Sequence, residues 1–401
     1  MNGSKKLNII IFDGSFKTTA FINRLILGLS RRHNVFVLGF NTDIEKKLEG
    51  VRYINLGNNT NKVNFLLVSL KLALQTVFYS GGIKRFIKLF NMLLHTNSLG
   101  VKKLNISNSI LKIKPDIIHL QWPTLLPLVE DVISLKKYSI VLSQRGYHIN
   151  VRASVDTEYQ NYLKQWYPRL DGFHSVSNTL KVNSNLIHNS AKKIDKVVYS
   201  GLDLKSINFN KSYEKSEPLK LLSVGRPHWK KGYSTMIQAC HLLKEKGLKI
   251  NYTIIGAAND EELIYLIEAY NLSYEIKLTD KVSQDEVYEI MRRSSVFILP
   301  SLEEGIANVV IEAMAIGLPV ISTNCGGMSE LISHLKTGII TPLNSIDALV
   351  DAVVKFNELS LDEIEKMRVE ARKKVEIQHS EEKMIDDMES LYRKCIDKPT
   401  V

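Results

Sequence analysis

Two glutamates in one short stretch have a spacing at which both carboxylates could bind one ligand. Residues 300–322 read PSLEEGIANVVIEAMAIGLPVIS, with Glu304 beside Gly305 and Glu312 inside an apolar run. Carboxylates accept paired hydrogen bonds, so vicinal hydroxyls of a sugar and of a ribose are natural partners. A helical path between the two glutamates spans up to ~12 Å, which leaves room for a diphosphate. A solvent-facing helical glutamate remains the alternative for Glu312.

Two cations stand after another predicted strand. SVGRPHWKKGY (223–233) supplies Arg226 and Lys231 between a strand and a helix. When a glycosidic bond to a nucleoside diphosphate breaks, the leaving group gains negative charge, and fixed cations stabilise it there. Ordinary surface cations are the alternative. The position after a strand, at the edge where parallel strands end, favours the catalytic interpretation.

The elements around Glu304 are expected to form an anion site. SVFILP (295–300) is typical of a buried strand, and Gly317 with Pro319 forms a helix stop. A helix from about residue 306 would therefore begin at the carboxyl edge of the sheet. Its first amide groups, near Gly305, Ile306 and Ala307, carry partial positive charge that suits a diphosphate.

The whole chain of 401 residues suits two domains. Short β-rich runs alternate with helical ones, which predicts parallel sheets. A polar stretch at 201–218 interrupts the series. We predict an α/β fold of two Rossmann-like domains facing each other across a cleft: 1–205, with a C-terminal helix 378–396 packing back on it, and 206–377.

Composition and charge indicate in which cellular compartment the protein acts and what kind of partner it binds. Three separated cysteines indicate reduced thiols in a cytosolic protein, and the longest apolar run (65–80) is too short to cross a membrane. Residues 1–205 hold 29 Lys and Arg against 12 Asp and Glu (+17), whereas 206–401 hold 24 against 30 (−6). We expect the first half to face an anionic surface, either nucleic acid or an anionic leaflet, and solvated lysines without a partner are the alternative. The stretch 62–95 either lies on a membrane or covers the first sheet as an amphipathic helix.

The motifs together resemble a known family. GRPHWKKG, VFILPSLEEGIANVVIEAMAIGLPVIS, GGMSEL and TGIITP look like the donor domain of family-four glycosyltransferases, which are retaining enzymes of the GT-B fold. The glutamate pair matches the E-x7-E motif of that family. Looser likeness in KPDIIHLQ, HSVSNTL and VVYSGLDL extends the resemblance over most of the chain.

The resemblance implies a role for each matching residue. Arg226 and Lys231 would bind the diphosphate, Glu304 the donor sugar and Glu312 the ribose. The other donor contacts would come from backbone at Gly14, Val282, Gly305, Ile306 and Ala307. In such enzymes a phosphate oxygen of the donor helps to deprotonate the acceptor, so the family needs no general base.

Two departures affect the acceptor side. Family members often carry a histidine–glycine pair after the fourth strand, where this chain has Arg145 before Gly146. Arg145 could act there by its charge, His148 could replace the histidine, or Arg145 could recognise an acidic sugar or a phosphate. The first turn, DGSFKTT, has one glycine where the family has a Gly-rich loop. The predicted acceptor contacts are Ser15, Lys17, Trp122, Tyr147 and His148.

The predicted activity is therefore transfer of a hexosyl or N-acetylhexosaminyl group from a UDP- or GDP-sugar, without metal or cofactor. The expected acceptor is a glycan or a polyprenyl-diphosphate-linked glycan of bacterial surface polysaccharide, at the anionic inner face of the plasma membrane. A non-catalytic nucleotide-sugar sensor or scaffold is the alternative. No nucleic acid is expected, because the lysines are scattered without an aromatic-basic motif.

Overall fold

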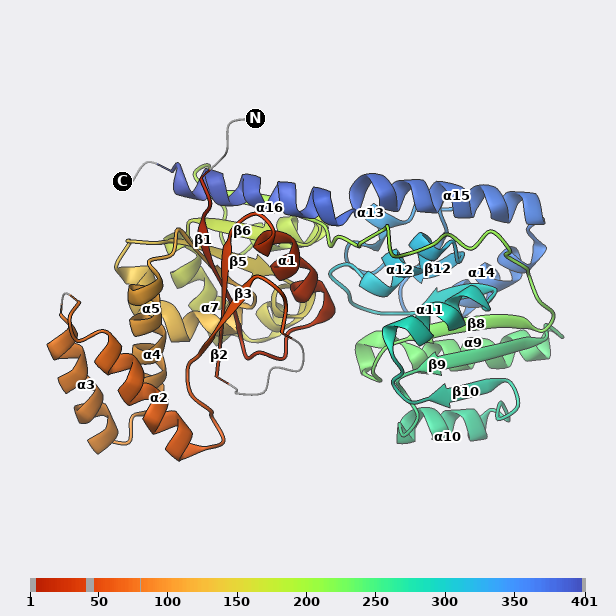
Figure 1. Cartoon of the computed structure of the whole chain (residues 1–401). Coiled ribbons are helices and arrows are strands. Elements are labelled where there is room, and N and C mark those ends of the chain that lie inside the picture. Colours follow the sequence, from red (N-terminus) through yellow and green to blue (C-terminus); the bar gives the residue numbers. More distant parts are fainter. Residues whose placement is uncertain (1–4, 41–46, 80, 399–401) are drawn as a thin grey trace. The chain divides into compact units, whose positions relative to one another are not determined.

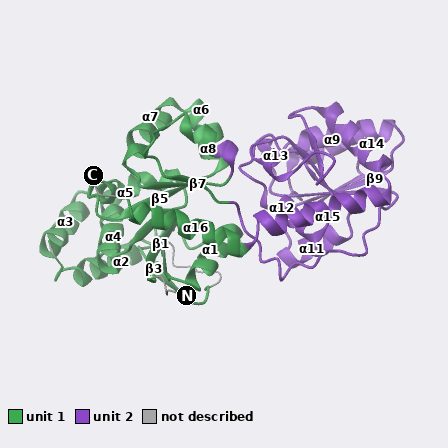
Figure 2. Cartoon of the chain, turned by 90° about the horizontal axis from the view of Figure 1, so that it is seen from above, with its two compact units in different colours: residues 1–176, 181–198, 381–401 green, residues 177–180, 199–380 purple. Residues whose placement is uncertain are grey.

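The computed structural model describes residues 5–40, 47–79 and 81–398. The chain forms two compact units, which Figure 2 distinguishes by colour. Unit 1 takes residues up to 176, 181–198 and those from 381 onward, and unit 2 takes 177–180 and 199–380. Each unit has its own parallel sheet, which confirms the predicted class of two Rossmann-like α/β domains.

Unit 1 is organised around a parallel sheet. Its described residues form seven strands in the order β3-β2-β1-β4-β5-β6-β7. Ile9, Ile11 and Val141 are buried in this core, as expected for strands covered on both faces. The strands are β1 (Asn8–Gly14), β2 (Asn34–Gly39), β3 (Val51–Asn55), β4 (Ile117–Leu120), β5 (Ser139–Gln144), β6 (Gly172–Ser175) and β7 (Asp195–Val197).

The helices of unit 1 lie in more than one layer. The stretch 62–95 is two helices rather than one, and both pack with α4 instead of covering the sheet (Figure 1). The α-helices are α1 (Ala20–Ser30), α2 (Lys62–Gln75), α3 (Gly82–Leu94), α4 (Ser98–Ile113), α5 (Leu126–Ser134), α6 (Ala153–Val155), α7 (Thr157–Trp166), α8 (Asn178–Asn185) and α16 (Glu381–Ile396). A π-helical segment, η2 (Tyr147–Arg152), follows β5.

The last helix returns to unit 1. Met384, Met388, Leu391 and Tyr392 of α16 are buried in the core cluster of the first sheet. The helix begins at Glu381 rather than 378. The reason is that α15 continues to Gln378 and residues 379–380 are not helical.

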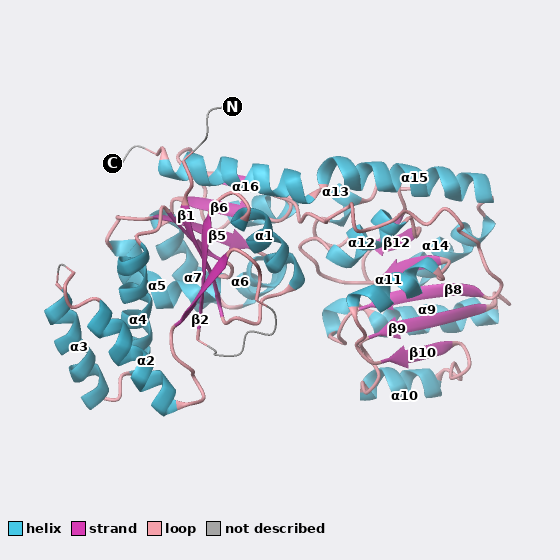
Figure 3. Cartoon of the chain, in the orientation of Figure 1, coloured by secondary structure: helices cyan, strands magenta, loops and turns pink. Residues whose placement is uncertain are grey.

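Unit 2 also has helices packed on a parallel sheet, which is made of six strands (Figure 3). Within its described residues the strand order is β10-β9-β8-β11-β12-β13, all parallel. The strands are β8 (Leu219–Val224), β9 (Ile250–Ile255), β10 (Ile276–Thr279), β11 (Val296–Leu299), β12 (Val320–Thr323) and β13 (Ile339–Thr341). The helices are α9 (Tyr233–Glu245), α10 (Glu261–Ala269), α11 (Gln284–Arg292), α12 (Asn308–Ile316), α13 (Met328–Leu331), α14 (Ile346–Glu358) and α15 (Leu361–Gln378).

The chain passes into unit 2 after residue 198, before the predicted boundary at 205. Tyr199 donates a hydrogen bond to Glu330 at 2.8 Å, which ties the first residue of this segment to unit 2. Glu330 also accepts from the backbone N–H groups of Asn178 and Thr179, so the first residues of α8 cluster with unit 2. Among the described residues, no helix has the length and apolarity to span a membrane.

Candidate donor and acceptor sites

The predicted donor loop lies between β11 and α12. The strand VFIL is fully buried and leads into a loop that ends at Ala307. The helix begins at Asn308 rather than near 306, because Ala307 is still extended (φ −83°, ψ 105°). Ala307 supplies no side-chain cap to the first turn, and Gly317 ends the helix with φ 85°. An uncapped helix start leaves backbone N–H groups that suit an anion.

Two glycines fix the backbone of this loop. Gly326 has φ +51°, and a Cβ atom there would lie 1.7 Å from the carbonyl oxygen of Glu304. The N–H of Gly327 donates to the carbonyl of Gly305 at 2.9 Å. Only glycine permits this approach, so GGMSEL acts as a support for the donor loop. The sequence shows the motif but does not show what its glycines contact.

Lys231 and Glu304 form an ion pair. The Nζ of Lys231 lies 2.6 Å from Oε1 of Glu304, and the Ser301 hydroxyl donates to the same oxygen at 3.1 Å. The loop that carries Lys231 is held close because Gly232 (φ +63°) packs on Pro300, where a Cβ atom would lie 2.0 Å from the Pro300 carbonyl oxygen. The two predicted residues are therefore brought together.

Arg226 extends the same edge. It follows β8 and is exposed. Within the described part of the chain, no hydrogen bond or ion pair holds its guanidinium. Arg226 is therefore a cation without a protein partner in the same β8–α9 connection as the ion-paired lysine, and it is suited to bind an anionic ligand.

Glu312 is buried on α12 and has an amide partner. Its exposed fraction is 6%, and its helical neighbours are apolar. The Nε2 of Gln284, at the start of α11, donates to Glu312 Oε2 at 3.2 Å. Val282 and Ile306 pack against the same apolar cluster as the rest of α12. The Gln284 amide is exposed beside the buried Glu312 carboxylate, so hydroxyl groups of a ligand can replace it as the hydrogen-bond donor.

In unit 1, three predicted residues gather where β1, β4 and β5 end. The Trp122 indole donates to Asp13, the residue before Gly14. The Arg145 guanidinium lies over the ring of Trp122, 5.3 Å from its centroid, and over the ring of Phe21 at 4.3 Å. Its Nη2 donates to Gln121 at 2.9 Å. This group is a cation held between two aromatic rings.

Burial perturbs both charges in this group. Desolvation raises the pKa of Asp13 to about 6, although the Trp122 hydrogen bond and the Arg145 charge act against it. Desolvation lowers the pKa of Arg145 to about 9, and Asp13 opposes that shift. The Nε of Arg145 and the Nε2 of Gln121 are buried without a hydrogen-bond partner. Perturbed groups with unused donors are typical of functional sites.

The remaining predicted acceptor residues lie in neighbouring loops of unit 1. The ring of His148 is 6.0 Å from that of Trp122, and Tyr147 beside it is 42% exposed. Ser15 accepts a hydrogen bond from the backbone of Lys17 at 3.3 Å. Gly14 has φ +88° and belongs to unit 1, whereas the other predicted donor residues belong to unit 2.

Sequence reasoning missed the polar and aromatic partners of these side chains. The partners are Ser301 and Gln284 in unit 2, and Asp13, Gln121 and Phe21 in unit 1. Asp13 lies near the end of β1 and Gln121 directly follows β4, and a polar residue at the carboxyl end of a buried strand is a usable signal. Gln284 and Phe21 lie on separate helices and carry none.

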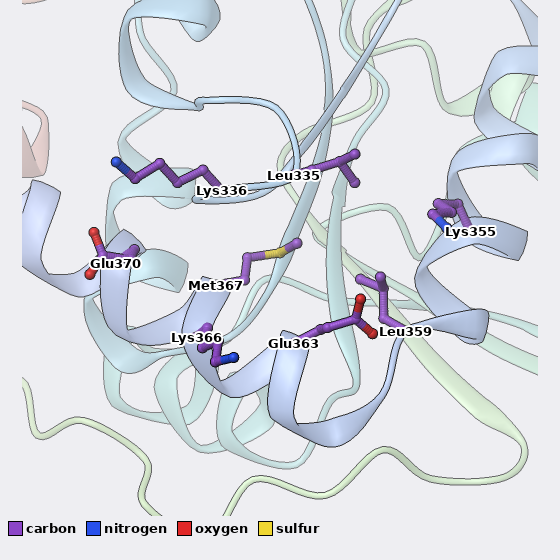
Figure 4. A pocket seen from close by; sticks show the side chains of 8 residues that line it. All are labelled: Leu335, Lys336, Lys355, Leu359, Glu363, Lys366, Met367 and Glu370. Carbon is purple, nitrogen blue, oxygen red and sulfur yellow. The ribbon is translucent and has the colours of Figure 1, made fainter.

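A pocket of about 420 Å³ opens elsewhere in unit 2 (Figure 4). Its lining includes Lys336, Lys366 and Glu363, and none of the predicted donor residues belongs to it. Among the described residues, no group of three or more His, Cys, Asp or Glu side chains could hold a metal ion.

Most of unit 2 matches a known family. Residues 205–374 match the model of the glycosyl transferases group 1. The putative colanic acid biosynthesis glycosyltransferase WcaL of Escherichia coli (strain K12) is 34% identical over 183 residues, which is 44% of this chain and 45% of that protein. The amylovoran biosynthesis glycosyltransferase AmsK of Erwinia amylovora is 33% identical over 198 residues, 48% of each chain. The matches span about half the length of these relatives.

Solved structures extend the likeness to nearly the whole chain. A glycosyltransferase from Rickettsia africae superposes with a TM-score of 0.72 at 18% identity, covering 98% of this chain and 100% of that one. Anabaena Alr3699/HepE, solved in complex with UDP-glucose, gives 0.72 at 15% identity, covering 96% and 100%. At these identities the likeness shows a shared fold.

Proposed function

Because residues 205–374 match the model of the glycosyl transferases group 1, we propose that this chain is a glycosyltransferase that uses a nucleoside-diphosphate sugar. The observation that carries the proposal is the Lys231–Glu304 pair beside the uncapped start of α12. Lys231 and Arg226 take the diphosphate together with the amides near Gly305. Glu304 takes hydroxyls of the donor sugar, and Glu312 takes those of the ribose.

The proposed step has a simple balance. The bond between the anomeric carbon and the diphosphate oxygen breaks, and the diphosphate leaves with the electron pair. The acceptor oxygen bonds to the same carbon, and its proton passes to an oxygen of the leaving diphosphate. Fixed cations at Lys231 and Arg226 stabilise the charge that develops on this oxygen. Departure and attack on one face of the sugar retain the anomeric configuration.

The acceptor is proposed to be a glycan, or a glycan on a polyprenyl diphosphate, of a bacterial surface polysaccharide. Relatives named for colanic acid, amylovoran and capsular polysaccharide biosynthesis support this class. The transferred group is a hexosyl or N-acetylhexosaminyl unit from a UDP- or GDP-sugar. Arg145, held over Trp122, takes an acidic sugar or a phosphate of the acceptor. Arg145 therefore binds the acceptor, and the imidazole ring of His148 lies beside Trp122 in the same group.

A panel of UDP- and GDP-sugars tests the proposal. The parent protein should transfer or hydrolyse one donor, and Glu304→Ala should lose most of that turnover. Lys249→Ala, which removes an exposed cation of the same unit, is the matched control. Equal turnover by the parent and Glu304→Ala would overturn the assignment. Donor binding without turnover, across a broad acceptor panel, would instead indicate a sensor or scaffold.

A further inference from the structure

The outer face of α3 is apolar and open to solvent. Its stripe consists of Ile83, Ile87, Phe90 and Leu94, with exposed fractions of 67%, 55%, 47% and 78%. Spacings of four, three and four residues place all four side chains along one side of the helix. Soluble helices normally bury such a stripe, so its exposure indicates a contact outside the chain.

The neighbouring helix enlarges this face. Val63, Leu67 and Leu74 of α2 are more than half exposed, and Phe78 in the following turn is 97% exposed. The opposite side of both helices supplies the packing, because Ala73 and Leu89 are buried against α4 residues in a small separate cluster. In Figures 1 and 2, α3 lies at the outside of unit 1, with α4 nearer the sheet. We call α2, residues 76–79 and α3 the hairpin.

The charge around the hairpin has one sign. Residues 50–115 contain ten Lys and Arg and no Asp or Glu, although the whole chain has 42 acidic residues. Lys71, Lys84 and Lys88 are exposed on the two helices that carry the apolar side chains. Cations beside a solvent-exposed apolar stripe match a surface that is anionic outside and apolar within.

A cavity next to α3 has the same dual character. It measures about 450 Å³ and lies between α3, α4 and α5. Its lining combines Arg85, Lys88 and Lys103 with apolar side chains of Met92 and Leu99, and includes Asp131. Arg85 is oriented by the Ser107 hydroxyl at 3.3 Å, and Lys103 pairs with Glu130 at 2.6 Å. Cations next to apolar walls suit the phosphate and upper acyl region of a lipid.

We propose that the hairpin docks unit 1 on an anionic phospholipid surface. The stripe of α3 and Phe78 enter the boundary between headgroups and acyl chains, while Lys71, Lys84 and Lys88 meet lipid phosphates. The cavity beside Arg85 takes one phosphate-bearing headgroup. This contact would bring the protein to a lipid-linked acceptor, and that purpose rests on the proposed function. The contact itself requires no catalysis.

Sedimentation with vesicles tests the docking. Vesicles of phosphatidylcholine alone are compared with vesicles that contain phosphatidylglycerol. The parent should bind the anionic vesicles and leave the neutral ones in solution. Lys84→Gln with Lys88→Gln should reduce binding by about 25-fold at low salt, since each basic residue near an anionic surface contributes about fivefold. Ile87→Asp with Phe90→Asp should reduce it by at least about tenfold.

The control places the same change on another exposed apolar pair. Ile264→Asp with Tyr265→Asp on α10 should bind like the parent. Circular dichroism equal to that of the parent, and equal affinity for whichever of UDP and GDP the parent binds, show that each variant is folded and that its donor site is intact. Vesicle binding by a parent that binds neither UDP nor GDP would refute the proposed function and keep the docking surface.

Three results would overturn the docking proposal. One is equal binding to neutral and anionic vesicles. Another is unchanged binding by the Ile87→Asp, Phe90→Asp variant. The third is a parent that fails to bind vesicles but dimerises, with the dimer abolished by that same variant, because the hairpin would then be a contact between two copies.

Discussion

The Nζ of Lys231 lies 2.6 Å from Oε1 of Glu304, although 73 residues separate the two in sequence. One side chain follows β8 and the other follows β11, which are neighbouring strands. Two glycines allow the close approach: Gly232, in the loop of Lys231, lies against Pro300, and Gly326, in the loop after β12, lies against Glu304. The pair therefore orients the lysine before a ligand arrives, at the place where the proposed leaving group gains charge.

Replacement of Glu312 should weaken binding of the nucleotide through its ribose. Glu312→Ala should raise the Kd of UDP about 10- to 100-fold, since a hydrogen bond to a charged group contributes about 1.5–3 kcal/mol. The measurement is calorimetric titration with UDP and with 2′-deoxy-UDP. The parent should prefer UDP, and the variant should bind both equally. A preference retained by Glu312→Ala would place the ribose elsewhere.

Arg145 should act on the acceptor rather than on the donor. Arg145→Gln should reduce transfer to the acceptor by about 100-fold or more, because it removes a fixed cation in a partly buried site. The Kd of UDP should stay within about twofold. Arg145→His, which restores the histidine–glycine pair of the resembled family, is the informative second variant. A large loss of UDP affinity in Arg145→Gln would contradict an acceptor role.

Asp13 should make unit 1 less stable as pH rises from 4 to 6. Its pKa is raised from 3.8 to about 6, so the folded state binds more protons than the unfolded state in this window. Stability then falls by about 1.4 kcal/mol per pH unit from this group, up to roughly 3 kcal/mol by pH 7. Asp13→Asn keeps an acceptor for Trp122 and removes the titration. Denaturant unfolding should show the variant gaining over the parent as pH rises; a constant difference would refute this.

A buried chain of hydrogen bonds through two histidines should make the protein less stable as pH falls. Tyr392 donates to His119, which donates to Ser143, which donates to His174, and His174 donates to the carbonyl of Val198. Because burial keeps both histidines neutral near pH 7 and the carbonyl can only accept, the hydrogen bonds run in this order. Desolvation lowers the pKa of His174 to about 3 and that of His119 well below its usual range.

The folded state therefore binds fewer protons than the unfolded state below pH 6.5. The His174 shift should cost about 1.4 kcal/mol of stability per pH unit as pH falls from 6.5 toward 3, and the lowered pKa of His119 acts in the same direction. His174→Leu should lower stability at pH 7 and flatten the fall between pH 6.5 and pH 5. Denaturant midpoints across this range provide the measurement. An unchanged slope would mean that His174 is protonated in the folded state.

The sequence predicts the elements that carry continuous apolar runs. VFILP becomes β11, and Gly317 ends α12 as its glycine and following proline predict. The edge strand β3, VRYIN, was not predicted, because Arg52 and Asn55 interrupt its apolar residues and it is incompletely buried. The interruption between α2 and α3 was missed too. At the interruption the Thr76 hydroxyl bonds back to the carbonyls of Leu72 and Ala73, and Gly81 before α3 has φ 74°.

Side-chain partners were beyond the reach of sequence patterns. Glu304 and Lys231 could be placed at one sheet edge from strand order, yet their ion pair depends on how two glycines seat the loops. The Gln284 partner of Glu312 lies 28 residues away on another helix, with no spacing rule to connect them. The Phe21 ring beneath Arg145 likewise comes from α1, far from the residue that it contacts.

Calorimetric titration of UDP and GDP into the parent and into Arg226→Ala with Lys231→Ala tests the donor site most directly. One nucleotide should bind the parent at micromolar to sub-millimolar concentration, and the double variant should bind it at least about 100-fold more weakly. Lys249→Ala should match the parent. Failure of the parent to bind either nucleotide at millimolar concentration, or equal binding by parent and double variant, would contradict the account.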